Sequence, residues 1–304
     1  YGGVPNNKVT AFAGESATGK TFFVLGVVSQ FLKDNPTGGV VFYDTEAAVT
    51  KEMMETRGID TERVIVAEPD TIQKFRTHAL NVIEQFEKTP EDKRPPMMMV
   101  LDSLGLLSTQ KEVEDSTAGK DVRDMTKSQL IKGAFRVLTL KLAKVNVPML
   151  VTNHVYEVIG SYIPTKEMGG GTGLKYAAST IAYLGKKKER DGTEIVGNII
   201  KVKMFKSRLS KENKTVEVLL RYDTGLDRYY GMVDAAIEAG IWNKSANRVE
   251  THQGQKVYPK AIYKEPEKYF TDDVMMVIDQ WAKNEFSYGM VNDRENDTVE
   301  SDSE

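Results

Sequence analysis

Short apolar runs alternate with longer amphipathic stretches from residue 9 to about residue 184. The runs predict buried strands at residues 9–13, 40–43, 64–66, 97–101, 149–152 and 180–184. Between them, apolar positions at helical spacing predict helices over residues 21–33, 51–56, 71–86 and about 127–145, and Gly58 fits the end of the second helix. Buried strands separated by helices indicate a mostly parallel sheet covered on both faces, which is an α/β fold.

The pattern changes after residue 184. Asp191-Gly192 is a hairpin signal, and strands are expected near residues 199–204 and 215–221, so the sheet should gain an antiparallel extension. A small mixed segment begins at about residue 231, with helices expected near 233–239 and 272–283. We therefore expect a core domain over residues 1–230, a small C-terminal α+β region over 231–290 and a tail over 291–304.

The composition is that of a soluble globular chain, since 40% of the 304 residues are hydrophobic and 28% are charged. No apolar run approaches the roughly 20 residues needed to span a bilayer, so no membrane association is expected. The chain has no cysteine, which excludes disulfides and cysteine-based zinc sites. A cytosolic location is the simplest interpretation.

Charge is unevenly distributed along the chain. The net charge is −3, but residues 291–304 carry six acidic residues and one basic residue. Without this segment the chain has 40 basic and 38 acidic residues. An acidic, apolar-poor segment of this kind is expected to be a solvated, disordered tail. It serves either solubility or competition with an anionic ligand for a basic surface, and the sequence leaves both open.

The sequence GESATGKT at residues 14–21 matches the phosphate-binding P-loop pattern G-x-x-x-x-G-K-[ST]. It follows a predicted strand and opens a predicted helix, as the motif requires. Lys20 supplies a cation for the β- and γ-phosphates of a nucleotide, and the hydroxyl of Thr21 is suited to ligate Mg²⁺. The expected nucleotide-binding residues are Gly14, Glu15, Ser16, Ala17, Thr18, Gly19, Lys20 and Thr21.

Acidic residues end two of the predicted strands. Asp102 follows the apolar run at 97–101, which is the form of a Walker B strand that delivers a carboxylate to Mg²⁺. Glu46 follows the run at 40–43 and is our candidate for the base that activates water. We favour Glu46 over Asp44 because it lies further beyond the strand end. Capping of the following helix is the alternative role, and it fits Asp44 and Thr45 better.

His154 ends the predicted strand at 149–152, where a contact with a γ-phosphate competes with an ordinary surface or core position. A polar, glycine-rich loop over residues 155–173 follows, and loops of this length are usually functional or disordered. Its GGGTG run is not a dinucleotide motif, because no predicted strand directly precedes it. These glycines favour a close backbone approach to a ligand such as a phosphodiester chain.

Taken together, these motifs resemble those of the RecA/Rad51 strand-exchange ATPases, and of their phage branch in particular. The resemblance runs from residue 1 to about 230 and rests on GESATGKT, FYDTEAAVT at 42–50, VLDSLGLLSTQKEVED at 100–115, DVRDMTKSQLIKGAFR at 121–136, TNHVYE at 152–157 and MGGGTGLKYAAST at 168–180. The first motif is common to many ATPases, whereas the combination of DSLG, DMTK and NHVYE with MGGGTG is far more specific.

The resemblance implies a RecA-like P-loop ATPase core that uses ATP and Mg²⁺. Lys20 and Thr21 would bind the phosphates and metal, and Asp102 would support the metal. Glu46 would activate water, and His154 would sense the γ-phosphate and report it to the loop behind it. The expected reaction is hydrolysis of ATP to ADP, with hydrolysis beyond ADP left open.

The resemblance also implies DNA contacts from two loops, near residues 109–125 and 155–172. Arg123 lies in the first loop. In the second, Tyr162 and Ile163 fall near the apolar residues that wedge between base triplets in the family's filaments. Gly169, Gly170 and Gly171 would let the backbone and the next helix meet DNA phosphates.

Lys206 and Arg208 match two basic residues that family members extend to the ATP of a neighbouring subunit. Such cations would neutralise charge that develops on the γ-phosphate. The alternative is a solvated basic hairpin together with the lysines at 186–188.

Two side chains and the chain start depart from the family pattern. Met53 stands where RecA has an aromatic residue against adenine, and His154 replaces a glutamine of RecA. The family's N-terminal segment, which docks on the adjacent subunit, is absent from this chain.

The function we expect is that of an ATP-dependent DNA recombinase. It would form helical filaments on single-stranded DNA and pair it with homologous duplex in recombination, repair and recombination-dependent replication. Mediator and single-strand-binding proteins are the further partners implied, and the cytoplasm of an infected bacterium is the implied location. The alternatives are a hexameric DNA helicase of the same fold, and an ATP-switched DNA-binding module without significant hydrolysis.

Overall fold

The structure is a computed structural model that describes residues 3–120, 124–157 and 166–288. It divides into two compact units. The larger contains Gly3–Arg208 and Thr215–Asp227, and the smaller contains Leu209–Lys214 and the described residues from 228 onward. The domain boundary expected near residue 230 stays a prediction. Within the described residues, no helix combines the length and the apolar character that crossing a membrane requires.

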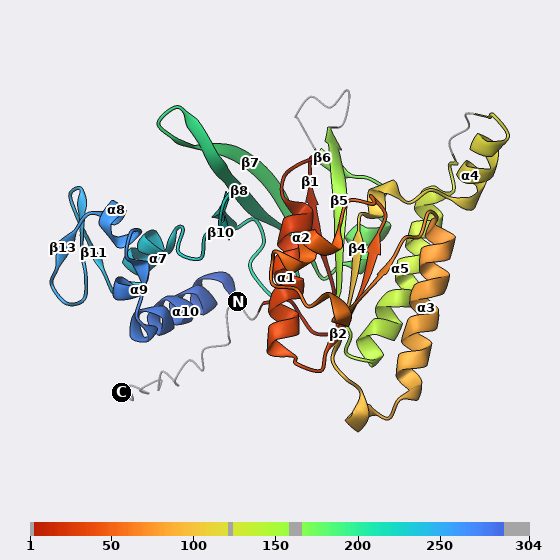
Figure 1. The fold of residues 1–304 in the computed structure, drawn as a ribbon, viewed down its shortest axis with the longest axis horizontal. Coiled ribbons are helices and arrows are strands. Elements are labelled where there is room, and N and C mark those ends of the chain that lie inside the picture. Colours follow the sequence, from red (N-terminus) through yellow and green to blue (C-terminus); the bar gives the residue numbers. More distant parts are fainter. Residues whose placement is uncertain (1–2, 121–123, 158–165, 289–304) are drawn as a thin grey trace, which may run out of the picture. The chain divides into compact units, whose positions relative to one another are not determined.

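The strands of the larger unit form one sheet, which has ten strands within the described residues. Their order is β10-β9-β8-β7-β1-β5-β4-β2-β3, and β6 pairs with β5 (Figure 1). The strands are β1 (Val9–Gly14), β2 (Gly39–Asp44), β3 (Val64–Ala67), β4 (Met97–Asp102), β5 (Met149–Glu157), β6 (Lys166–Met168), β7 (Thr180–Asp191), β8 (Glu194–Ser207), β9 (Thr215–Arg221) and β10 (Gly225–Leu226).

Strands β7, β1, β5, β4, β2 and β3 run parallel, and β8, β9, β10 and β6 are antiparallel to their neighbours. The predicted α/β fold with an antiparallel extension is therefore confirmed. The hairpin strands β7 and β8 are longer than expected. Lysines interrupt the apolar pattern there, but backbone pairing continues, as between Lys187 and Ile199.

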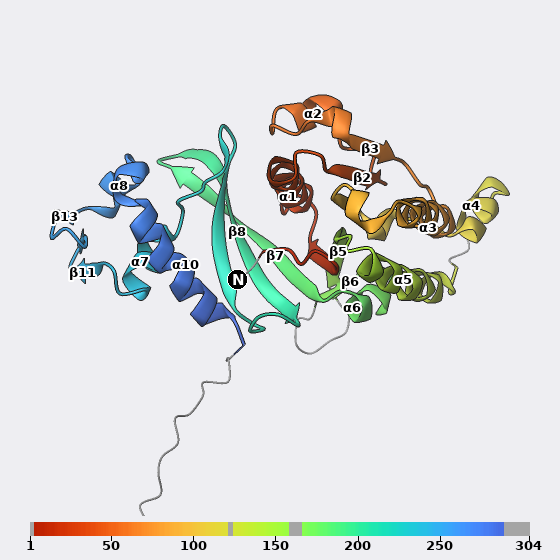
Figure 2. The ribbon, with the colours of Figure 1, turned by 90° about the horizontal axis from the view of Figure 1, so that it is seen from below.

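Alternate residues of the central strands β2, β4 and β5 enter two separate cores. Met99 and Leu101 of β4 pack on one face with α3 (Ile72–Lys88), α5 (Lys127–Lys144) and α6 (Gly173–Ala177). Met98 and Val100 pack on the other face with α1 (Lys20–Asp34) and α2 (Lys51–Glu55). The two helix layers are visible from below in Figure 2. Because each fully buried aliphatic side chain contributes about 1.5–3 kcal/mol, both layers hold the central strands rigidly.

Two segments expected to be loops contain regular structure. Helix α4 (Gln110–Thr117) lies within residues 109–125 and begins at a capping box. Thr109 accepts a bond from the N–H of Glu112, whose carboxylate accepts one from the N–H of Thr109. In the second segment β5 extends to Glu157 and pairs with β6. Strand β6 directly precedes the GGGTG run, so the expectation that no strand does so was wrong.

The smaller unit combines helices with a three-stranded sheet in the described residues. Its core surrounds Trp242, whose ring centroid lies 5.0 Å from that of Phe270. The sheet and the helices α8 and α9 are too short to give a periodic sequence signal. The elements are α7 (Met232–Glu238), β11 (Asn243–Ser245), β12 (Arg248–Glu250), β13 (Lys256–Val257), α8 (Pro259–Ile262), α9 (Pro266–Tyr269) and α10 (Asp272–Phe286).

Candidate active site

The register of the parallel strands brings the predicted site residues to one edge of the sheet. Gly14 at the end of β1 is paired with His154 of β5, and Asp44 at the end of β2 is paired with Asp102 of β4. Glu46 lies two residues beyond the end of β2. The carboxyl edge of a parallel sheet is the usual position for a ligand.

The P-loop links β1 to α1 through two left-handed residues. Ala17 has φ 58° and Gly19 has φ 85°, and Gly19 caps the N-terminus of α1. Gly14 needs its missing side chain for a different reason. A Cβ there would lie 2.5 Å from Oγ1 of Thr18 and 2.8 Å from the carbonyl oxygen of Leu184. This tight curvature turns backbone N–H groups toward the centre of the loop, which is the geometry of an anion site.

Lys20 folds back over the P-loop. Its Nζ donates to the carbonyl oxygens of Gly14 and Glu15 at 3.1 and 2.8 Å, and the side chain is buried. Burial lowers the pKa of Lys20, and the carboxylates of Glu46 and Asp102 oppose that shift. An anion with several oxygens bound in the loop would supply the negative counter-charge that this buried ammonium lacks.

Asp102 is 2% exposed and lies between two hydroxyl groups. The hydroxyl of Thr152 donates to Oδ1 of Asp102, and Thr21 also bonds this carboxylate. Burial raises the pKa of Asp102, and the nearby charges of Glu46 and Asp44 add to that increase against the effect of the hydrogen bonds.

The oxygen ligands of Thr21 and Asp102 fit Mg²⁺, which prefers oxygen ligands and keeps several waters. Among the described residues, no group of three or more His, Cys, Asp or Glu side chains forms a metal site. Phosphate oxygens and water must therefore complete the coordination of a Mg²⁺ bound here.

Glu46 and His154 form the polar pair of the site. Oε1 of Glu46 lies 3.0 Å from Nε2 of His154. Burial acts to raise the pKa of Glu46, but hydrogen bonds from His154 and Ser103 and the charge of Lys20 together hold it below its usual value. The Glu46 side chain remains 28% exposed, so this ionised carboxylate is accessible to water.

Asp44 and Thr45 shape the turn that carries Glu46. Oδ1 of Asp44 accepts from the N–H of Glu46, and Oδ2 accepts from the N–H of Val49. The hydroxyl of Thr45 donates to the carbonyl of Ser103 at 2.7 Å. Helix α2 is capped instead by Thr50. The helix-capping role considered for Asp44 and Thr45 was therefore wrong, because both side chains make their hydrogen bonds in the turn before the helix begins.

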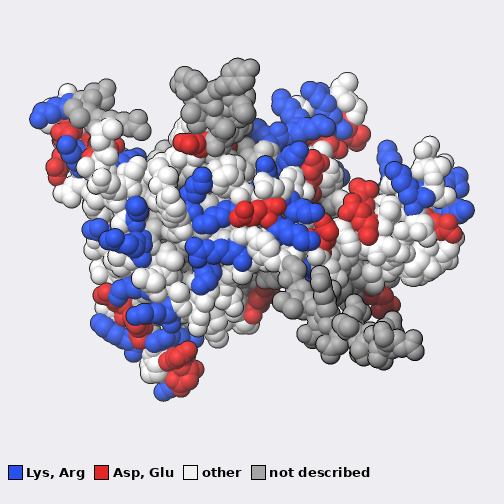
Figure 3. Space-filling model, turned by 180° about the vertical axis from the view of Figure 1, so that it is seen from behind, with Lys and Arg blue, Asp and Glu red and all other residues white. Residues whose placement is uncertain are grey.

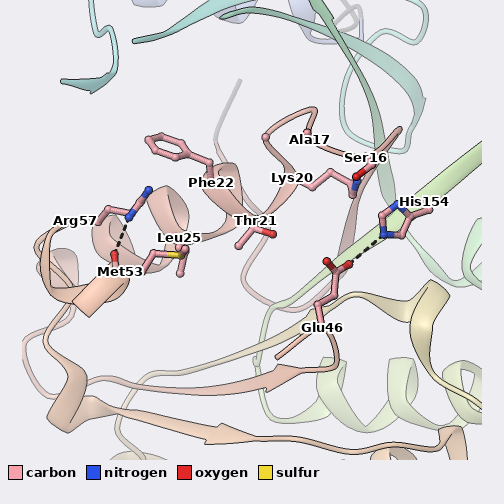
Figure 4. A pocket seen from close by; sticks show the side chains of 11 residues that line it. Ser16, Ala17, Lys20, Thr21, Phe22, Leu25, Glu46, Met53, Arg57 and His154 are labelled. Atoms are coloured by element: carbon pink, nitrogen blue, oxygen red, sulfur yellow. Dashed lines mark hydrogen bonds and ion pairs between the residues drawn. The ribbon is translucent and has the colours of Figure 1, made fainter. Parts of the chain in front are cut away.

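Residues of the P-loop, Glu46 and His154 line a cavity of about 250 Å³. Glu46, Lys20 and His154 lie at one end, and Phe22, Leu25, Met53 and Arg57 lie at the other (Figure 4). Sequence reasoning missed Phe22 and Arg57, because no motif marks them and only the packing of α1 beside α2 brings them together. Thr152 was also missed, although its place at the end of a strand beside Asp102 was a usable signal.

Asn153 connects this cavity to the GGGTG run. Its Nδ2 donates to the carbonyl of Gly169 at 2.9 Å, and its Oδ1 accepts from the N–H of His154. The N–H of Gly169 also donates to the carbonyl of His154. Asn153 is fully buried. His154 and Gly169 are therefore joined by one backbone hydrogen bond and by the two hydrogen bonds of the Asn153 amide.

The glycines of the GGGTG run approach α5 closely. A Cβ on Gly170 would lie 2.6 Å from Cδ1 of Ile131, and one on Gly171 would lie 2.6 Å from Oγ of Ser128. Both glycines have left-handed backbone, with φ 78° and 77°. Packing against α5 therefore already requires glycine at these positions. Their predicted contact with DNA stays a prediction.

We expect Gly170→Ala to destabilise the larger unit by about 1–3 kcal/mol, because the methyl group meets Ile131 and the residue must keep a left-handed backbone. Gly133→Ala is the matched control. Gly133 lies in α5, where an added Cβ would meet nothing within 4 Å, and the change should be neutral or stabilise by up to about 1 kcal/mol. Chemical denaturation of both variants checks this. Equal stability of the two would contradict the packing argument.

Lys206 and Arg208 lie near the end of β8. Nζ of Lys206 donates to the carbonyls of Lys175 and Ala178 at 2.7 and 2.8 Å, at the C-terminus of α6. Arg208 is exposed, and its backbone N–H donates to Ser179. Basic side chains form several groups on the face opposite that of Figure 1, with acidic side chains between some of them (Figure 3). The predicted role of both residues toward a neighbouring subunit stays a prediction.

Three predicted DNA-binding residues lie outside the described residues. They are Arg123, Tyr162 and Ile163. The described ends of the first predicted loop are joined, since Oγ1 of Thr109 donates to Oδ2 of Asp124 at 2.7 Å. Met125, next in the chain, is 84% exposed.

A P-loop at the carboxyl edge of a parallel sheet, with Asp102 and Glu46 on neighbouring strands, defines a P-loop nucleotide-binding protein. The chain belongs to the RecA family. Residues 1–227 match the sequence model of the RecA N-terminal domain. The resemblance stated from the motifs is thus confirmed.

Several curated proteins are similar to this chain. It is 33% identical over 235 residues to the recombination and repair protein of Enterobacteria phage T4, which covers 77% of this chain and 59% of that protein. It is 30% identical over 251 residues to protein RecA of Chloroherpeton thalassium, covering 80% and 66% of the two chains. It is 29% identical to protein RecA of Thermus aquaticus over 250 residues, covering 81% and 70%. The chain thus spans about 59–70% of the length of these relatives.

Proposed function

We propose that this chain is a DNA-dependent ATPase that acts as a recombinase on single-stranded DNA. The observation that carries the proposal is the Glu46–His154 pair, which faces the P-loop across the cavity and is joined through Asn153 to the segment that precedes α6. In such an arrangement, the binding or loss of a γ-phosphate in the cavity would change the contacts of the segment that precedes α6. Membership of the RecA family and similarity to a phage recombination and repair protein support the same proposal.

The P-loop residues 14–21 bind the triphosphate in the proposed reaction. Backbone N–H groups and the N-terminus of α1 receive the phosphate oxygens, and Lys20 exchanges its carbonyl partners for them. Thr21 and Asp102 would hold Mg²⁺, which would supply positive charge that stabilises the phosphates during transfer.

Glu46 orients the attacking water and accepts its proton. Its pKa lies below the usual value, so the carboxylate is ionised at neutral pH and ready to act as a base. His154 holds Glu46 in place before a γ-phosphate is bound, and it turns to the γ-phosphate when one is present. Loss of the phosphate returns His154 to Glu46, and Asn153 passes this change to Gly169.

The remaining parts of the proposal extend beyond the nucleotide site. The segments 109–125 and 155–172 contact DNA, and copies of the chain assemble into a helical filament on it. Lys206 and Arg208 then reach the nucleotide of the neighbouring copy. Homologous pairing and strand exchange follow, with mediator and single-strand-binding proteins as partners in the cytoplasm of an infected bacterium.

Three assays on one preparation test the function. We expect ATP hydrolysis that single-stranded DNA stimulates, and exchange of a homologous strand between a circular single strand and a linear duplex. A forked duplex should not be unwound in either direction. Directional unwinding without exchange would instead identify a helicase, and DNA binding that depends on ATP but shows no hydrolysis would identify a switched binding module.

A further inference from the structure

The end of the cavity opposite Glu46 is built from flat and apolar groups. The guanidinium carbon of Arg57 lies 4.8 Å from the centroid of the Phe22 ring. Nη1 of Arg57 donates to the carbonyl oxygen of Met53 at 2.8 Å, which fixes the guanidinium plane. Leu25 is fully buried behind them. These residues come from α1, from α2 and from the turn that follows α2, all within the larger unit, and Figure 4 shows them side by side.

The position of Phe22 is fixed from its other side as well. A Cβ on Gly225 would lie 3.2 Å from Cζ of Phe22, so this glycine lets the backbone at the start of β10 pack directly against the ring edge. The Nε of Arg57 is buried and has no hydrogen-bond partner in the structure. Holding an unpaired N–H there is costly, and the contact with Phe22 offsets part of that cost.

At this end of the cavity a nucleotide base finds surfaces on which to stack but almost no partners for base-specific hydrogen bonds. Arg57 carries strong donors, but its N–H groups lie in the guanidinium plane and do not point at a base stacked on its face. The side chains of Phe22, Leu25 and Met53 include no strong donor or acceptor. The carbonyl of Met53 is already occupied by Arg57. Adenine and guanine differ only in donors and acceptors at their ring edges. A site without matching groups therefore cannot separate them strongly, whereas it favours a large ring system over a small one.

We propose that Arg57 and Phe22 form a stacking platform that selects purine nucleotides by the area of the base and accepts ATP and GTP alike. This proposal rests on the proposed function, since it concerns the nucleotide of that same site. It assigns base recognition to the phenylalanine of α1 and to a guanidinium from the turn after α2, with Met53 as an apolar side wall. Arginine suits this role because its planar, delocalised cation stacks on aromatic rings, which a lysine ammonium does not do.

Equilibrium competition against a ribose-labelled fluorescent ATP tests the proposal on the whole chain with Mg²⁺ and without DNA. The competitors are ATP, GTP, CTP and UTP. We expect the dissociation constants of ATP and GTP to agree within about fivefold, and those of CTP and UTP to be roughly tenfold weaker, because stacking contributes about 1–3 kcal/mol per base.

Two variants address the platform itself. Arg57→Lys keeps the charge but removes the plane, and Phe22→Leu keeps apolar bulk but removes the ring. Each should reduce purine affinity by about tenfold while changing pyrimidine affinity less, so the purine preference shrinks. Arg136→Lys is the matched control, because Arg136 is exposed on α5 outside the cavity. It should leave all four affinities unchanged.

The outcomes separate the platform from the proposed function. Binding of ATP with more than about thirtyfold rejection of GTP would overturn the platform alone, because it requires base-specific hydrogen bonds. An unchanged purine preference in both Arg57→Lys and Phe22→Leu would overturn it too. Failure of the wild-type chain to bind any of the four triphosphates would overturn the ATPase proposal and the platform together.

Discussion

Glu46→Gln is expected to reduce DNA-stimulated ATP hydrolysis by about 10²–10⁴-fold, the usual contribution of a general base. The amide keeps the size of the side chain and retains an oxygen that can accept from His154, but it cannot accept a proton from water. Nucleotide affinity should stay within a few fold of wild type, because Lys20 and the P-loop backbone are untouched. Phosphate release and fluorescent nucleotide binding, measured side by side, check both expectations.

A matched control is available on the same part of the chain. Glu52 is exposed in the first turn of α2 and does not line the cavity, so Glu52→Gln should hydrolyse ATP at the wild-type rate. Equal rates for Glu46→Gln and Glu52→Gln would remove Glu46 from the reaction.

The pKa of Glu46 also sets a direction for pH dependence. This pKa is depressed in the folded protein by His154, Ser103 and Lys20, against the effect of burial. The carboxylate therefore remains ionised through the neutral range. Its contribution to hydrolysis is lost as the pH falls through this folded-state pKa. The stability gained from its partners is fully present above the unfolded-state pKa and is lost as the pH falls through the lower folded-state pKa.

Lys20→Met is expected to weaken ATP binding by about a hundredfold, because each lost hydrogen bond to a charged group is worth about 1.5–3 kcal/mol. Methionine fills the same volume without the ammonium. The loss of bonds to the carbonyls of Gly14 and Glu15 is offset in part by relief from burying a charge, which already lowers the pKa of Lys20. The folded state should therefore survive the change.

A thermal-shift titration separates binding from folding in this variant. ATP at about a hundred times the wild-type dissociation constant should raise the melting temperature of wild type clearly and that of Lys20→Met much less, since a ligand stabilises the folded state according to its affinity for it. Lys33→Met, at the far end of α1, is the control and should respond to ATP as wild type does. A full ATP-induced shift in Lys20→Met would show that the ammonium is not needed for binding.

The sequence predicted those residues of the site that lie at or just beyond the ends of strands. Asp102, Glu46 and His154 each follow an apolar run, and parallel register brings such positions to one edge. The capping box at Thr109 was a readable signal for α4 that we did not use. The sequence of strand β6 carried no comparable signal, because a strand of three residues is too short to show an alternating pattern.

Contacts between side chains of different elements could not be predicted from the sequence. Nothing in the pattern of residues 22 and 57 indicates that Phe22 and Arg57 stack, since their contact depends on how α1 and α2 lie on the sheet. For Gly170 and Gly171 the sequence predicted a close approach of the backbone to a ligand. The structure shows a close approach to α5, which the sequence did not indicate, and the contact with DNA stays a prediction.

The hydrogen bonds of Lys206 have a consequence for assembly. Its ammonium closes the C-terminus of α6 by binding the carbonyls of Lys175 and Ala178. A contact with a neighbour's phosphate would compete with these bonds, so in the proposed assembly each such contact would loosen the end of the helix that follows the GGGTG run. Thermodynamic linkage implies the converse effect. A partner that stabilises the C-terminus of α6 would weaken the contact between neighbouring subunits by the same free energy.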